Sequence, residues 1–458
     1  MFQKLRVNFF TVLVGLLCVS QVHAQKQYKG LLWEISGNGI DAPSYLYGTM
    51  HVSNKIAFHL TDSFFIGLKS CDIVALETNP QKWLRDMKKT GLFSEYSPRN
   101  SVPGSGFYES LFELYIPENR DLGGMLSQDN DMINPLLTRL TRGSEDFSEN
   151  TYLDMFLYQA GMKQGKKVVN LEGYRRSFML GQKAIIPDKK EEKQEQIREY
   201  KLSEMRENGK NPYEMLQDAY RRGNLNGIDS INMLTSGKRY RMLFLTRRNI
   251  IMCDNLDSIL QKKKTVFTGI GAAHLPGDSG VIELLRSKGY KVRSVKGKKT
   301  KKGQKMWDKI DDKMVEMPLD TTFIASDSLF KVKVPGLMVE MPGNDQQKDY
   351  LYSDMTNGAF YSVTRLNTYG FLQNTNEDHM EKRMDSLFFE SIPGDIIDKE
   401  KIERFGFTGY DILNKTVRGD LQRYQIFITP LEIIVFKMGA TGTFVSKMPP
   451  AAAFFNSI

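Results

Sequence analysis

Two segments of the chain share the pattern Gly-x-x-His, namely Gly48–His51 and Gly271–His274. The whole sequence contains only five histidines, so a repeated arrangement around two of them is unusual. Glycine permits a tight turn and a close approach of the backbone, and a neutral imidazole can act as a metal ligand or a general base. The repeated pattern therefore predicts one functional site that contains both His51 and His274.

Each Gly-x-x-His segment directly follows a short apolar run that is typical of a β-strand, and two acidic residues occupy similar positions. Glu77 directly follows the run Asp72–Leu76, and Glu172 directly follows the run Lys167–Leu171. In an open parallel sheet, ligands bind outside the carboxyl ends of the strands. Ionisable side chains beside apolar strands are unfavourable unless they meet partners. We therefore expect these side chains to meet one another or a metal ion.

A purely structural role is the alternative for the first three of these residues. His51 or His274, taken alone, could be a buried and hydrogen-bonded histidine. Glu77 could cap a helix, because the following Thr78-Asn79-Pro80 has the residue types of a helix start. The repetition of the histidine pattern and the shared position after a strand favour a functional role for all three.

The remaining candidates lie on predicted helices or beside other charges. Glu172 could pair with the basic segment Tyr174–Arg176, and Asp154 has the sequence context of an ordinary surface carboxylate. Arg247 and Arg248 lie inside a long, mostly apolar helix, where they either form a solvated face or help to stabilise negative charge in the site. The helical register alone does not choose between the two arginines.

The elements that must position these residues alternate between strand and helix. We predict an α/β fold with a mainly parallel sheet that is flanked by helices and interrupted by helical insertions at 81–150 and 188–260. The predicted strands are Ser44–Tyr47, Asp72–Leu76, Lys167–Leu171, Thr265–Thr268 and Tyr290–Val295. The predicted helices are Thr61–Ser70, Leu153–Gln164, Lys238–Leu260 and Gly280–Ser287.

The composition changes near residue 300. We predict an α/β domain over 25–295, a basic linker over 296–314 and a small α+β accessory domain with a curled antiparallel sheet over 315–458. The predicted strands of the second domain are Leu329–Val334, Ala359–Leu366, Leu421–Ile428 and Leu431–Met438, with one helix at His379–Glu390 and an apolar terminal segment, Ala453–Ile458, that could dock as a strand. The net charge of +9 comes largely from the linker region. This basic segment lacks interleaved aromatic residues and a recognised binding motif, so we expect no nucleic-acid partner.

The N-terminal 24 residues have the features of a signal peptide. Lys4 and Arg6 precede an apolar stretch, and Val22-His23-Ala24 offers the small residues that a signal peptidase reads. We therefore expect an exported, periplasmic or extracellular protein, although a retained anchor, and hence membrane association, is the alternative. Export would leave two cysteines, Cys71 and Cys253, which could pair or remain as buried thiols.

Several blocks, in this order, resemble the TraB/GumN family over about residues 30–295. The blocks are Tyr45–Val52, Asp72–Glu77, Lys166–Glu172, Arg248-Asn249-x-x-Met252, Gly271–Gly277 and Gly289–Val292. That family is similar to the TIKI proteases of animals, which use two Gly-x-x-His motifs and a glutamate with a divalent metal. The specificity of the resemblance comes from the order of the blocks, since none of them is distinctive alone.

The resemblance implies a ligand set of His51, Glu77 and His274 for manganese or cobalt, with zinc as a further possibility. From the residue types we expect a catalytic group of Glu77, Glu172 and Arg248, in which Glu172 or Asp154 could complete the ligand set or act as general base and Arg248 could stabilise the oxyanion. The resemblance favours Arg248 over Arg247. It does not settle whether Asp154 and Glu172 belong to the site. We therefore expect a metal-dependent hydrolase that acts on a peptide or protein substrate.

Two other functions stay open at this point. The family is distantly related to erythromycin esterases, so the same residues could form a metal-independent hydrolase in which a histidine is the base. It is also distantly related to haem-binding ChaN-like lipoproteins, so the cleft could bind haem or a peptide without catalysis. The second domain carries no recognised catalytic motif, and we expect it to serve as a binding or assembly module.

Overall fold

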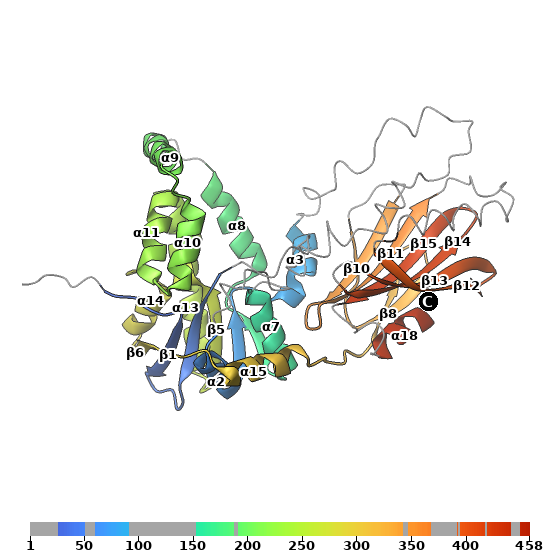
Figure 1. Ribbon diagram of the computed structural model, residues 1–458, viewed down its shortest axis with the longest axis horizontal. Coiled ribbons are helices and arrows are strands. Elements are labelled where there is room, and N and C mark those ends of the chain that lie inside the picture. The colour runs from blue at the N-terminus through green and yellow to red at the C-terminus, as the bar shows by residue number, and fades with distance from the viewer. Residues whose placement is uncertain are drawn as a thin grey trace, which may run out of the picture.

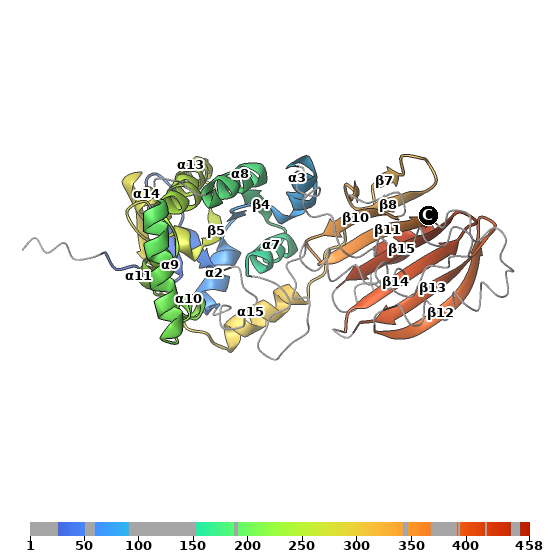
Figure 2. The same ribbon diagram turned by 90° about the horizontal axis from the view of Figure 1, so that it is seen from above.

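The structure is a computed structural model that describes residues 26–50, 60–90, 153–186, 191–341, 347–367, 392, 394–416, 419–440 and 449–458. Figures 1 and 2 show an α/β domain, coloured blue to yellow, beside a domain of antiparallel strands, coloured orange to red. The predicted signal peptide lies outside the described residues.

A six-stranded sheet forms the centre of the first domain, in the order β4-β3-β5-β2-β1-β6. Its strands are β1 (Leu32–Gly37), β2 (Ser44–Thr49), β3 (Ile73–Leu76), β4 (Lys167–Asn170), β5 (Val266–Gly271) and β6 (Tyr290–Ser294). Pairing is parallel from β4 through β3 and β5 to β2, whereas β1 is antiparallel to β2 and β6. The sheet is therefore mixed, because an antiparallel strand that we did not predict lies between β2 and β6.

Helices cover this sheet on both faces, which explains why every residue of β3 and β5 is buried. The helices beside the sheet are α2 (Asp62–Ser70), α7 (Leu153–Lys163), α13 (Arg247–Leu260) and α14 (Val281–Ser287). Helix α7 lies very close to the sheet at Gly161, where a Cβ atom would come within 2.9 Å of the Val74 side chain and 3.0 Å of Val168. A larger residue at this position would push α7 away from β3 and β4.

The other helices extend the first domain away from the sheet (Figure 1). They are α3 (Trp83–Thr90), α8 (Tyr174–Ile185), α9 (Glu192–Glu207), α10 (Pro212–Arg221) and α11 (Leu225–Thr235). The charged stretch that begins the second predicted insertion forms α9, in which only Leu202 is buried. This helix matches the solvated helix that its dense alternation of Glu and Lys predicts.

The predicted helix Lys238–Leu260 is not regular. It consists of a short α12 (Lys238–Tyr240), a π-helical segment η3 (Arg241–Thr246) and α13. A π-helical turn inserts an extra residue into the helical register, and such turns occur frequently at functional sites. Here the irregular turn ends directly before Arg247 and Arg248.

The segment 296–314, which we predicted as a basic linker, contains helix α15 (Lys301–Asp311) and packs against the first domain. The Trp307 ring stacks on Phe156 of α7 with a centroid distance of 4.4 Å. The Asp62 carboxylate accepts hydrogen bonds from the backbone of Thr300 and Gly303 near the start of α15. We did not predict this helix from the sequence, because its many lysines made its one apolar side difficult to recognise.

The second domain contains a seven-stranded antiparallel sheet in the order β12-β13-β14-β15-β11-β10-β9. Its strands are β9 (Val339–Glu340), β10 (Gln347–Asp354), β11 (Ala359–Asn367), β12 (Asp395–Arg404), β13 (Phe407–Lys415), β14 (Leu421–Ile428) and β15 (Glu432–Ala440), and a hairpin of β7 (Thr321–Ile324) and β8 (Lys331–Val334) lies beside it. The predicted strands Leu421–Ile428 and Leu431–Met438 correspond to β14 and β15, which pair antiparallel on either side of Pro430.

The chain ends in helix α18 (Pro449–Asn456) and not in a docked strand. Phe454 packs edge-on against Tyr361 of the sheet at 5.2 Å, so the apolar end of the chain is buried as a helix. The predicted helix His379–Glu390 lies outside the described residues.

The two domains share polar contacts around Gln81, which lies four residues after Glu77. Its side-chain amide donates to the Ser353 carbonyl oxygen at 3.2 Å, and its side-chain oxygen accepts from the Met355 backbone at 3.3 Å. The Gln159 amide of α7 donates to the Met355 carbonyl oxygen at 3.1 Å. The antiparallel domain is therefore held directly against the segment that follows β3.

Within the described part of the chain, no helix is both long enough and apolar enough to cross a bilayer. Cys71 and Cys253 are both free and buried, which answers the question of whether they pair. Burial raises the pKa of each thiol to about 12, so both are protonated at neutral pH.

Candidate functional site

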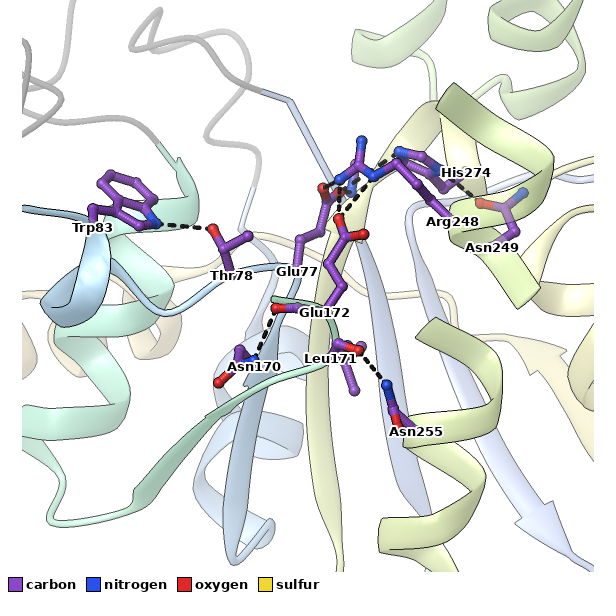
Figure 3. A network of polar contacts seen from close by, with 11 residues as sticks. Glu77, Thr78, Trp83, Asn170, Leu171, Glu172, Arg248, Asn249, Asn255 and His274 are labelled. Atoms are coloured by element: carbon purple, nitrogen blue, oxygen red, sulfur yellow. Dashed lines mark hydrogen bonds and ion pairs between the residues drawn. The ribbon is translucent and has the colours of Figure 1, made fainter. Parts of the chain in front are cut away.

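The candidate site lies at the carboxyl ends of the four parallel strands β4, β3, β5 and β2. Register pairs Leu76 of β3 with Asn170 of β4 and with Gly269 of β5, and it pairs Gly271 of β5 with Thr49 of β2. All four strands therefore end at one edge of the sheet. Figure 3 shows Glu77, Glu172, Arg248 and His274 directed toward one another at this edge.

The two Gly-x-x-His segments leave adjacent strands and pack against each other. A Cβ atom on Gly48 would lie 3.3 Å from the Ala272 Cα atom and 3.2 Å from its Cβ atom, so glycine permits this close approach. The Gly48 carbonyl oxygen accepts a hydrogen bond of 2.9 Å from the buried Tyr220 hydroxyl. The first segment is described through Met50, and His51 lies outside the described residues.

A buried cluster of two carboxylates and one guanidinium joins β3, β4 and α13. Arg248 Nη2 lies 2.6 Å from Glu77 Oε2, and Arg248 Nε lies 2.7 Å from Glu172 Oε1, with a second contact from Nη2 to Glu172. The side chains of Arg248, Glu77 and Glu172 are 5%, 11% and 0% exposed. Arg248 is thus the arginine that faces the carboxylates, whereas Arg247 is exposed.

The charges of this cluster affect one another. Burial raises the pKa of Glu172 above its usual value, and the hydrogen bonds and charge of Arg248 oppose this shift only in part. Burial works against the charge of Arg248, but its hydrogen bonds with Glu172 and the negative charge of Glu77 outweigh it and raise the Arg248 pKa. Glu172 therefore holds a proton more readily than an exposed glutamate does.

Glu77 does not act as the helix cap that we considered from the sequence. Asn79 has that role, because its side chain accepts a hydrogen bond of 3.0 Å from the Gln81 backbone. Glu77 Oε1 instead accepts from the Gly271 backbone at 2.7 Å, which ties the end of β3 to the second Gly-x-x-His segment. In the same way, Glu172 pairs with Arg248 and not with the neighbouring basic segment.

The orientation of His274 follows from its contact with Asn249. The two side chains lie 2.6 Å apart, between His274 Nδ1 and Asn249 Oδ1. The Asn249 amide donates to the Ser279 carbonyl oxygen at 2.8 Å, and a carbonyl oxygen can only accept, so Oδ1 is the atom turned toward His274. Nδ1 therefore carries a proton, and in the neutral ring the basic lone pair is on Nε2.

Asp154 is not the ordinary surface carboxylate that we expected. Its Oδ1 atom accepts a hydrogen bond of 2.6 Å from the Thr49 hydroxyl, within the first Gly-x-x-His segment. The contact joins Asp154 to Thr49, which precedes His51 by two residues in the sequence. His59 and His379 lie outside the described residues.

Asn249 and Phe244 are also parts of the site, and we did not predict either of them from the sequence. Phe244, in the π-helical turn, lies beneath the Arg248 guanidinium at 4.7 Å, and its ring centroid is 6.4 Å from that of His274. An amide and a phenyl ring carry no distinctive spacing, so neither residue stood out. The only available signal was the position of Asn249 directly after Arg248 in one of the family-like blocks.

The donor atoms of the site are compatible with a divalent metal. His274 Nε2 lies 3.9 Å from Glu77 Oε1, whereas two such ligands of one cation, each about 2.1 Å from it, lie within about 4.2 Å of each other. Among the described residues, no group of three His, Cys, Asp or Glu is arranged around a common point. Any third protein ligand of this type must therefore come from outside the described residues, and the sequence suggests His51 as the candidate.

Comparison with known proteins identifies the first domain. The sequence profile of the TraB/PrgY/gumN family matches residues 31–294. The chain belongs to this family. The TraB/PrgY/gumN match covers the sheet, both Gly-x-x-His segments and the cluster around Arg248, and it ends at the last residue of β6.

Other comparisons add little to the family match. No curated protein matches the chain. A crystal structure of a protein of unknown function from Pseudomonas aeruginosa, described as a putative regulator, covers 29% of this chain and 90% of its own length. It has 12% sequence identity and a TM-score of 0.18, which is too low to support any inference about this chain.

Proposed function

We propose that the protein is an exported, metal-dependent hydrolase that cleaves peptide bonds. The observation that supports this proposal most directly is the pair formed by His274 Nε2 and Glu77 Oε1, which are 3.9 Å apart beside the buried Arg248. The proposal of export depends on the N-terminal 24 residues, which have the charge and apolar pattern of a signal peptide.

His51, Glu77 and His274 would hold a manganese, cobalt or zinc ion. A bound ion of this kind lowers the pKa of a water molecule and polarises a carbonyl group. Asn249 would keep the His274 lone pair directed at the site by accepting the Nδ1 proton. Gly271 would help to orient Glu77 by donating its backbone N–H to Oε1.

The remaining residues would manage protons and charge. Glu172, whose pKa burial raises, would accept a proton during attack and return it to the leaving amine. Arg248, the buried cation beside the His274–Glu77 pair, would stabilise negative charge that develops on the substrate. Asp154 would position the first Gly-x-x-His segment through the Thr49 hydroxyl.

One observation also favours a second function, a metal-independent esterase. The contact with Asn249 fixes the tautomer that leaves Nε2 of His274 unprotonated, and a histidine in this state is a general base even without a metal. In that case Arg248 would stabilise the oxyanion, and the glutamates would serve to orient His274 and Arg248.

Metal analysis of the purified full-length protein separates the two functions. We expect stoichiometric manganese, cobalt or zinc in the wild type, and loss of that metal in both His51→Ala and His274→Ala. His379→Ala, which changes a histidine without a comparable sequence context, serves as the control. A parallel peptide-library assay should show cleavage by the wild type and by the His379→Ala control, and no cleavage by His51→Ala or His274→Ala. Full metal content in both site variants, or ester hydrolysis by metal-free protein, would contradict the proposal.

A further inference from the structure

We propose that a cleft between α8 and α13 is a subsite that binds a carboxylate of the peptide substrate. The cleft has a volume of about 520 Å³ and is lined by Arg176, Leu180, Arg247, Ile250 and Ile251. This volume lies within the range of about 300–1,000 Å³ that is usual for ligand pockets. The inference rests on the proposed function, because it names the substrate group that the same site would select.

Each wall of the cleft is one stripe of a helix. Arg176 and Leu180 are four residues apart on α8, and Ile250 and Ile251 follow Arg247 by three and four residues on α13. Residues at these spacings lie on the same side of a helix. The cleft is therefore built by two regular helices and does not depend on loop conformation.

The two helices that line the cleft also adjoin or carry residues of the buried cluster. Helix α8 begins two residues after Glu172, and α13 carries Arg248 directly after Arg247. Consecutive residues of an α-helix are separated by about 100° around the axis, so Arg248 points to the carboxylates while Arg247 points into the cleft. A substrate bound at the strand ends would thus have its neighbouring residues beside Arg247 and Arg176.

Within the part of the chain that the structure describes, the two cleft arginines have no acidic partner. Among the described residues, neither Arg176 nor Arg247 forms an ion pair or a side-chain hydrogen bond, and both are exposed. Arg248 of the same helix, by contrast, is fully paired with Glu77 and Glu172. Two unpaired guanidinium groups that line one cleft give it a positive charge that a bound anion would complement.

The apolar lining restricts the kind of anion. Leu180, Ile250 and Ile251 favour a ligand whose charge is carried on a short apolar stem. Guanidinium groups bind carboxylates through planar, paired hydrogen bonds. A peptide offers this combination in the side chain of glutamate and in an apolar residue at a free C-terminus.

The test measures binding and cleavage separately on the full-length protein. Fluorescently labelled peptides of one sequence would carry glutamate, glutamine or leucine at a single position with an amidated C-terminus, and a fourth peptide would carry leucine and a free C-terminus. The variants are Arg176→Gln and Arg247→Gln. Arg175→Gln is the matched control, because it removes the same charge from the same helix at a residue that does not line the cleft.

We expect the wild type to bind one of the two carboxylate peptides better than the neutral peptides. Arg176→Gln and Arg247→Gln should each weaken that binding by roughly three- to tenfold, since the charge-assisted contacts are partly exposed to water. Arg175→Gln should bind as the wild type does. The peptide that responds identifies whether the carboxylate comes from a side chain or from the chain terminus.

The subsite is ruled out if the two cleft variants and the Arg175→Gln control bind all peptides alike, or if the wild type prefers the neutral peptides. These outcomes are distinct from failure of the proposed function. If the protein binds carboxylate peptides through Arg176 and Arg247 but cleaves no peptide, the proposed subsite is supported and the proposed peptidase activity is contradicted. If the two cleft variants bind and cleave all peptides as the wild type does, the peptidase activity is supported and the subsite is contradicted.

Discussion

Asn249 fixes the tautomer of His274 through a contact of 2.6 Å between Oδ1 and Nδ1. The amide is itself oriented by its hydrogen bond to the Ser279 carbonyl oxygen. Groups that hold the second nitrogen of a histidine usually determine whether the first nitrogen can bind a metal or accept a proton. The residue after Arg248 thus supports the histidine, while Arg248 itself contacts the two glutamates.

Replacement of Asn249 by alanine should weaken metal binding by about 10- to 100-fold, because the His274 ring would lose its fixed tautomer and orientation. Isothermal titration with manganese would measure this change. Asn249→Asp keeps an acceptor for Nδ1 and should retain more affinity than Asn249→Ala, whereas the exposed control Asn208→Ala should match the wild type. Equal affinities for wild type and Asn249→Ala would contradict the positioning role.

Replacement of Arg248 by alanine should lower the free energy of unfolding by about 3–5 kcal/mol, because two glutamates would remain buried without a cation. Denaturant unfolding would measure this loss. Arg247→Ala is the matched control on the same helix, and its exposed side chain should change stability by no more than about 0.5 kcal/mol. Similar losses in both variants would show that the buried cluster is not what distinguishes the two arginines.

The pH dependence of stability should reveal the raised pKa of Glu172. In the unfolded chain the pKa of this glutamate is about 4.3, whereas burial raises its pKa in the folded protein. Protonation therefore favours the folded state below the unfolded value, and this contribution is lost as the pH rises through the folded pKa. The free energy of unfolding, measured with urea, should fall with pH in the wild type relative to Glu172→Gln.

The comparison with Glu172→Gln cancels most of the titration of the other carboxylates, since both proteins contain them. A difference between wild type and variant that stays constant from about pH 4 to about pH 7, or that grows in favour of the wild type, would mean that the Glu172 pKa is not raised.

Gln81→Ala should lower the free energy of unfolding by about 1–3 kcal/mol, because it leaves backbone groups of Ser353 and Met355 without their partner. Lys82→Ala, which changes the exposed neighbour, should have little effect. Hydrogen exchange should also become faster in the segment that joins Glu77 to Gln81, and unchanged exchange there would show that the second domain does not hold this segment.

The sequence predicted the parallel strands and their charged ends well, because short apolar runs that stop at Glu77 or Glu172 have few structural explanations. It did not reveal β1 (Leu32–Gly37), whose burial does not alternate regularly. The choice of Arg248 over Arg247 came from the family resemblance and not from helical spacing, since the π-helical turn before them alters the register. Helix α15 was not predicted, because Trp307 lies among lysines in a segment that is typical of a solvated linker.

The core of the first domain includes residues from beyond the end of the family match at residue 294. They are Ile310, Val339, Met341, Leu351, Met355 and Phe360, all of which are buried in the same apolar cluster as the six-stranded sheet. A chain that stopped at the family boundary would expose this surface to water and become prone to aggregation. The unit that is recognisable by sequence is therefore smaller than the apolar core to which it belongs, and one side of the second domain forms part of the interior of its neighbour.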